Sequence, residues 1–152
     1  MIEPSFNNGS FDISENHITV KHGKLTGGSF VFPIVSIKNF NLPDSLKEQL
    51  LHHLKSADFF NMALYPEASF SITKVQSYSG GISDAIAGAN YLIEGNFTML
   101  GKTNVISFPA YISITGNKLL VEAKCRVDRT KWGMNYASDP DGGLYIHKEV
   151  QL

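Results

Sequence analysis

The sequence predicts an all-β domain, an antiparallel barrel or sandwich with one short helix inserted between strands. Three observations lead to this prediction. Apolar and polar side chains alternate in several runs, as they do on strands with one face in water. Turn sequences join these runs into hairpins, and the strand-helix-strand rhythm of a parallel sheet is absent. A helical spacing of apolar residues occurs only between residues 45 and 55.

The N-terminal half contains short alternating runs and the predicted helix. The runs cover residues 11–13, 18–20 and 30–34, and the segment "SENH" separates the first two. Ser45 and Glu48 have the spacing of a capping box, which predicts the start of a helix. The apolar stripe of this helix is interrupted by one histidine and comprises Leu46, Gln49, Leu50, His53 and Leu54.

Alternation is strongest in the C-terminal half. A strand is predicted after Pro66, and a long loop rich in glycine and small residues follows at 79–90. Further strands are predicted at 91–99, 106–114 and 119–128, with turns at "LGKT" and at Gly116-Asn117. The small inward residues are expected to leave space along the axis of a barrel, and these are Gly95, Ala110 and Ala123.

The size and charge of the chain narrow the classes of function. Its 152 residues fit a single domain, 1–152, whose core needs no disulfide. The net charge of −1 argues against nucleic-acid binding and against contact with an anionic membrane surface. No apolar run approaches the roughly 18 residues of a membrane span, so stable membrane insertion is not expected. A periplasmic or secreted location is expected only if a leader has been removed.

The sequence contains no motif for catalysis or for metal binding. The Gly-Gly pairs lack the spacing of a phosphate-binding loop, and His52 and His53 diverge by about 100° on a helix. Cys125 continues the apolar face of a strand, which favours a packed core thiol over a nucleophile. We therefore expect no enzymatic activity, no metal and no cofactor.

Three features allow two interpretations each. His53 is expected to bond a backbone carbonyl or to contact a ligand. Arg129 follows Asp128 at the end of a predicted strand. It is expected to form a surface ion pair or to anchor the strand end by hydrogen bonds, or else to be a polar group at a pocket mouth. Phe59 and Phe60 are expected to plug a barrel end or to form a ligand wall. Because adjacent side chains point in different directions, one should pack under the helix and the other should line the mouth.

Four segments resemble the YceI-like family of small proteins with a lipocalin-like barrel. They are "KLTGGSFVFPIVSI", "HLKSADFFNMALYPEASFSITKV", "GNFTMLGKT" and "DRTKWGMNY", and they occur in the family's order over most of the chain. The resemblance implies a barrel of about eight antiparallel strands around an apolar tunnel that holds an isoprenoid or other lipid chain. It also implies no catalysis, frequent secretion to the bacterial periplasm, and often a homodimer.

The chain departs from the family pattern at both ends. No tryptophan precedes Trp132, and "LYIHKEVQL" stops where a final strand would run on. Both affected strands help to close the barrel, so closure stays open at this point.

The expected function is the binding, carriage or sequestration of a long isoprenoid or similar lipid. The alternative is a dry barrel, with an interior filled by side chains and not by a ligand, that acts through its surface as an interaction or stress-related scaffold protein. Lipid binding needs an apolar tunnel with a few polar groups at its mouth. The residues expected to form the ligand site are His53, Phe59, Phe60, Phe70, Ile72, Phe97, Met99, Phe108, Ile112, Val121, Ala123, Cys125, Arg129 and Trp132.

Overall fold

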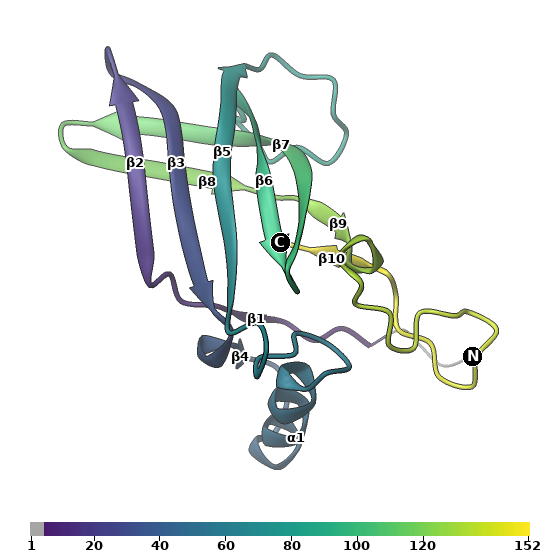
Figure 1. Ribbon diagram of the computed structural model, residues 1–152. Coiled ribbons are helices and arrows are strands. Elements are labelled where there is room, and N and C mark those ends of the chain that lie inside the picture. Colours follow the sequence, from purple (N-terminus) through teal and green to yellow (C-terminus); the bar gives the residue numbers. More distant parts are fainter. Residues whose placement is uncertain (1–4) are drawn as a thin grey trace.

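The main sheet curls into a half-barrel with one helix beneath its lower end (Figure 1). The computed structural model describes residues 5–152. The sheet has six antiparallel strands in the order β2-β3-β5-β6-β7-β8. This arrangement confirms the predicted all-β fold class. Within the described residues the two edge strands, β2 and β8, do not pair with each other, so the sheet stays open.

The elements follow one another mostly through hairpins. The sheet strands are β2 (Glu15–Lys21), β3 (Lys24–Pro33), β5 (Glu67–Ser77), β6 (Tyr91–Met99), β7 (Lys102–Thr115) and β8 (Lys118–Ala123). Two short pairs lie outside this sheet: β1 (Gly9–Ser10) with β4 (Lys38–Asn39), and β9 (Arg126–Asp128) with β10 (Glu149–Gln151). The helical elements are α1 (Asp44–Lys55) and the 3-10 turns η1 (Ile34–Ser36) and η2 (Arg129–Trp132).

Two-residue turns set the register of the hairpins. Leu100 and Gly101 both have positive φ, at 53° and 68°, which is the geometry that matches the twist of flanking strands. The turns predicted at "LGKT" and at Gly116-Asn117 are therefore confirmed. His22 and Gly23 form a third turn of this kind, with φ of 52° and 73°, which the sequence pattern did not predict.

Three strand predictions differ from the structure. Residues 11–13 form no strand, and Phe11 packs edge-on against Phe60 with ring centroids 5.4 Å apart. The next strand begins at Glu15, so it includes most of the segment predicted to separate two strands. The run at 119–128 breaks after Ala123, because the chain leaves β7 there and pairs with β10 instead.

The helix is confirmed, but its predicted cap is wrong and its predicted apolar face is only partly right. It begins at Asp44 after an N-cap at Pro43, and no side chain caps it, so Ser45 lies inside the first turn. Leu46 is 49% exposed. Leu50, His53 and Leu54 of the predicted stripe are half-buried, Gln49 is exposed, and Lys47, Leu51 and Lys55 are half-buried in addition. No residue of α1 is fully buried, so the stripe of apolar residues alone did not fix its orientation.

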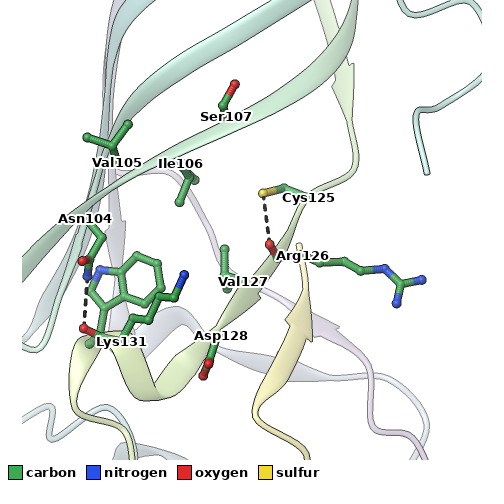
Figure 2. Close-up of a pocket in the computed structure, with 10 residues that line it drawn as sticks. Asn104, Val105, Ile106, Ser107, Cys125, Arg126, Val127, Asp128 and Lys131 are labelled. Carbon is green, nitrogen blue, oxygen red and sulfur yellow. Dashed lines mark hydrogen bonds between the residues drawn. The ribbon is translucent and has the colours of Figure 1, made fainter. Parts of the chain in front are cut away.

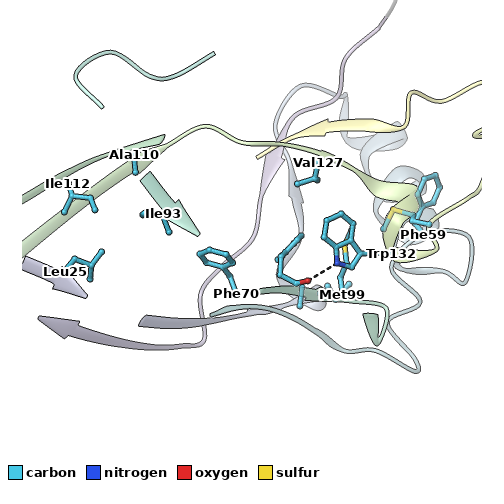
Figure 3. Packing of buried hydrophobic residues seen from close by; sticks show 13 residues of the cluster. Leu25, Phe59, Phe70, Ile93, Met99, Ala110, Ile112, Val127 and Trp132 are labelled. Atoms are coloured by element: carbon cyan, nitrogen blue, oxygen red, sulfur yellow. Dashed lines mark hydrogen bonds between the residues drawn. The ribbon is translucent and has the colours of Figure 1, made fainter. Parts of the chain in front are cut away.

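The core lines the inner face of the sheet and continues to η2. Figure 3 shows it running from Leu25 and Ile112 past Phe70 to Trp132. Contrary to expectation, Gly95 and Ala110 leave no space. A Cβ at Gly95 would lie 2.6 Å from the Phe70 ring, and Ala110 is 0% exposed. Only Ala123, which is exposed, borders open space.

The close approach of Phe70 to Gly95 predicts that Gly95→Ala overpacks the core and lowers the free energy of unfolding by about 1–3 kcal/mol. Gly27→Ala is the matched control on a strand, because the nearest atom to a Cβ there is 3.8 Å away. Chemical denaturation of both variants checks this prediction. Equal stabilities of the two variants would contradict the packing at Gly95.

Candidate functional site

An apolar cavity opens on the inner face of the half-barrel. Its volume is about 160 Å³, and almost all of its wall is apolar. The rings of Phe70 and Phe108 lie against each other in it, with centroids 5.6 Å apart. The full lining is Phe32, Phe70, Phe97, Ile106, Phe108, Ala123, Cys125 and Leu152.

Strand pairing positions this lining. Phe70 on β5 is directly opposite Phe97 on β6, and paired residues share one face of a sheet. Cys125 lies after the end of β8, where its backbone exchanges hydrogen bonds of 3.0 and 2.7 Å with Leu152. This pairing brings Leu152 to the cavity. The wall is therefore assembled from strands far apart in the sequence.

Five of the residues expected to contact a ligand line this cavity: Phe70, Phe97, Phe108, Ala123 and Cys125. Phe32 and Ile106 were not proposed as site residues, although their alternating positions on inward-facing strands could have identified them. Leu152 had no signal in the sequence, because it reaches the cavity only through the pairing of β9 with β10.

The other expected wall residues lie deeper or nearer the open edge. Met99 and Ile112 are buried in the core, and Ile72 packs against it. Val121 shares the inner face of β8 with Ala123 but is 41% exposed. At the opposite edge, Ile18 of β2 is directly across from Gly28 and is 42% exposed. Both edge strands thus present inward apolar side chains to water.

The aromatic corner after the helix is a packed plug. Phe59 is 7% exposed and lies between the rings of His53 and Tyr136, with centroid distances of 4.9 and 5.3 Å. Phe60 packs on Phe11. Neither phenylalanine lines the apolar cavity, so the expectation that one of them lines its mouth does not hold. The side chain of His53 does not bond a backbone carbonyl, and it lines neither cavity described here. Its Nε2 instead lies 2.8 Å from the Asp58 carboxylate.

Arg129 is a buried anchor and not a group at a pocket mouth. It is 2% exposed, and burial lowers the pKa of its guanidinium. Its nitrogens donate to four backbone carbonyls at 2.7–3.0 Å, those of Met134, Tyr136, Ile146 and His147. Its Cζ also lies 6.0 Å from the centre of the Phe59 ring. The strand-end anchor is therefore the interpretation that the structure supports.

The residues next to Arg129 in the sequence stabilise the turn η2 and its surroundings. The Asp128 carboxylate accepts hydrogen bonds from the hydroxyl and backbone N–H of Thr130, and these bonds lower its pKa. Trp132 is 1% exposed, and its Nε1 donates to the Phe97 carbonyl at 2.9 Å. Gly133 ends η2 with φ of 83°. The segment "DRTKWG" thus has a structural explanation at each of these positions.

A second cavity, called here the polar cleft, lies between β7 and β9 (Figure 2). Its volume is about 270 Å³. It shares Ile106 and Cys125 with the apolar cavity. Its lining is Asn104, Val105, Ile106, Ser107, Cys125, Arg126, Val127, Asp128, Lys131 and Trp132.

The described residues contain no cluster of His, Cys, Asp or Glu that could hold a metal ion. Within the same residues, no helix has the length and apolar character needed to cross a membrane. Cys125 borders both cavities, and burial raises the pKa of its thiol.

The hydrogen bonds of Arg129 predict that Arg129→Ala lowers the free energy of unfolding by about 3 kcal/mol or more, because buried carbonyls lose their donors. Arg129→Lys should recover little, since an ammonium cannot reproduce the planar fork of the guanidinium. Arg126→Ala is the control, because Arg126 and its partners are exposed and water screens their ion pairs. Urea denaturation compares the three, and similar losses for Arg129→Ala and Arg126→Ala would contradict the anchor.

Comparison with known proteins supports the same fold. The family model for the YceI-like domain matches residues 2–152. The YceI protein of Campylobacter jejuni is 15% identical, with a TM-score of 0.70 over 100% of this chain and 84% of that one. BcnA of Burkholderia cenocepacia is 18% identical, with a TM-score of 0.69 over 94% of this chain and 82% of that one. No curated protein sequence matches the chain. Because the family model covers essentially the whole sequence, the chain belongs to the YceI-like family.

Proposed function

We propose that the protein binds a long apolar chain, of the isoprenoid or a similar lipid class, along the inner face of the half-barrel. The observation that carries this proposal is the apolar cavity beside Ala123 and Cys125, which is open at the edge of the sheet. Its lining offers aromatic and aliphatic surface and almost no polar atoms. Such a wall suits a ligand without hydrogen-bonding groups along its length.

The geometry also suggests how a chain longer than the cavity would lie. A volume of about 160 Å³ accommodates only part of a long lipid. The remainder would cover the exposed inward side chains of the edge strands, such as Val121 on β8. Burial of each methylene group contributes about 0.8 kcal/mol, so even partial cover of this face favours binding.

We propose further that binding involves no catalysis. Cys125 is the one nucleophilic side chain of the apolar cavity, and its raised pKa keeps it a protonated thiol near neutral pH. No histidine lines either cavity to act as a base beside it. These features support a role in holding or carrying the lipid.

Native mass spectrometry of protein purified without detergent tests the proposal. We expect an additional mass of several hundred daltons that is lost on denaturation. Ala123→Trp should abolish this mass with little loss of melting temperature, because Ala123 is exposed and lines the cavity. Ala110→Trp is the matched control: Ala110 is 0% exposed, so a ring there should destabilise the fold by about 1–3 kcal/mol or more. Undiminished ligand mass in Ala123→Trp would refute binding at this cavity.

The position of Cys125 predicts that a bound lipid protects its thiol. Maleimide reacts with the thiolate, so the raised pKa of Cys125 should make labelling slow even without ligand. A saturating prenyl alcohol should slow it further by covering the cavity wall. A cysteine introduced by Lys118→Cys in a Cys125→Ser background is the control, since Lys118 is exposed and lines neither cavity. Identical labelling of Cys125 with and without lipid would exclude it from the binding site.

A further inference from the structure

We propose that the Phe70 ring is the stop that limits how far a bound chain enters the half-barrel, and that it thereby sets the chain length that the protein prefers. This inference rests on the proposed binding of an apolar chain in the apolar cavity. It adds the residue that determines specificity for the length of that chain.

The Phe70 ring leans along the sheet, away from the position of its own backbone. Phe70 is paired with Phe97 on β6. Gly95 is opposite Ile72, one step further along the same face. The Phe70 ring nevertheless lies over Gly95, where a Cβ would be 2.6 Å from two of the ring carbons. Diagonal neighbours of this kind are within reach of an aromatic side chain, and a residue without a Cβ gives the ring its place.

Phe108 completes the obstruction. Its ring and that of Phe70 have centroids 5.6 Å apart and are inclined by 41°. Phe108 on β7 is paired with Ile93, the next inward residue of β6 beyond Gly95. Both rings line the apolar cavity, so together they form a wall between the cavity and the rest of the half-barrel. A chain that enters from the open edge of the sheet meets this wall.

The interior beyond the two rings is filled by side chains. The core continues past Phe70 with four residues that are 5% exposed or less (Figure 3): Leu25, Ile93, Ala110 and Ile112. None of these four lines the apolar cavity. The strands β5, β6 and β7 all continue beyond Phe70, so the cavity ends there because a ring occupies the path and not because the sheet ends.

Truncation of Phe70 should therefore lengthen the cavity. The ring has the cavity on one side and the Gly95 position on the other, so the space that it vacates would join the cavity directly. Apolar spaces opened in this way inside proteins stay dry and accept apolar molecules. The ring removed by Phe70→Ala is similar in size to an isoprene unit. Phe70→Leu opens part of the same space with a smaller disturbance of the core.

The test compares prenyl alcohols of two, three and four isoprene units. Their affinities for the wild-type protein, Phe70→Leu and Phe70→Ala are measured by displacement of a fluorescent fatty alcohol. The measured quantity is the affinity for the four-unit alcohol relative to the two-unit alcohol. Each further methylene that becomes buried raises affinity about fourfold. Phe70→Leu should therefore raise the ratio about fourfold or more, and Phe70→Ala should raise it further.

Phe30→Leu is the matched control. Phe30 is directly opposite Phe70 on β3 and packs against the same core, but it lines neither cavity. Its truncation removes the same atoms from the same face of the sheet without lengthening the path, so the ratio should stay at the wild-type value. Melting curves establish which variants are folded, and Phe70→Leu decides the test if Phe70→Ala does not fold.

The possible failures are distinguishable. An unchanged ratio in Phe70→Leu, or an equal rise in Phe30→Leu, would refute the stop at Phe70 while binding of the chain stands. If none of the prenyl alcohols binds to the wild-type protein, the proposed function fails and this inference fails with it.

Discussion

The buried guanidinium of Arg129 is the interaction on which the C-terminal third of the structure depends. Its hydrogen bonds hold four carbonyls of a segment that has almost no regular secondary structure of its own, residues 133–148. That segment leads into β10, and the pairing of β10 with β9 brings Leu152 to the backbone of Cys125. One wall of the apolar cavity is therefore held by a cation that lies outside it. The hydrogen bonds that Trp132 and Asp128 make fix the two ends of the same short turn.

The departure of the chain from β7 after Ala123 explains why the molecule has two adjoining cavities and not one closed core. A strand that continued along β7 would fill the polar cleft with backbone hydrogen bonds and would narrow the apolar cavity. The pairing of β9 with β10 leaves this gap, and the core nevertheless stays dense where the sheet is complete. The Phe70 ring occupies the space above Gly95, and the Trp132 ring packs against Phe97 at one end of the core. Space for a ligand is thus confined to the open edge.

Local alternation in the sequence was enough to predict most of the main sheet, the fold class and much of the apolar wall, because inward positions on long strands such as β6 and β7 repeat every second residue. Long-range effects could not be predicted in this way. The period of two continues unbroken through Cys125, and only its pairing with Leu152 shows that the strand has ended. The size of Gly95 suggested free space, yet the ring of a neighbouring strand fills it. The partners of Arg129 lie 5–18 residues away in an irregular segment, where no periodic pattern could indicate them.

The open edge also has a kinetic consequence. A ligand enclosed by a complete barrel leaves through an end or waits for strands to separate, and each route breaks hydrogen bonds or requires a concerted movement. Under the proposed function, a lipid chain beside β8 would leave sideways, and the barrier would mainly be the rehydration of its apolar surface, which grows with each methylene exposed. Exchange should therefore depend on the length of the bound chain more than on the stability of the sheet. Under the proposed function, such exchange would suit the transfer of a lipid to a partner, because residence times decide how readily a carrier releases what it holds.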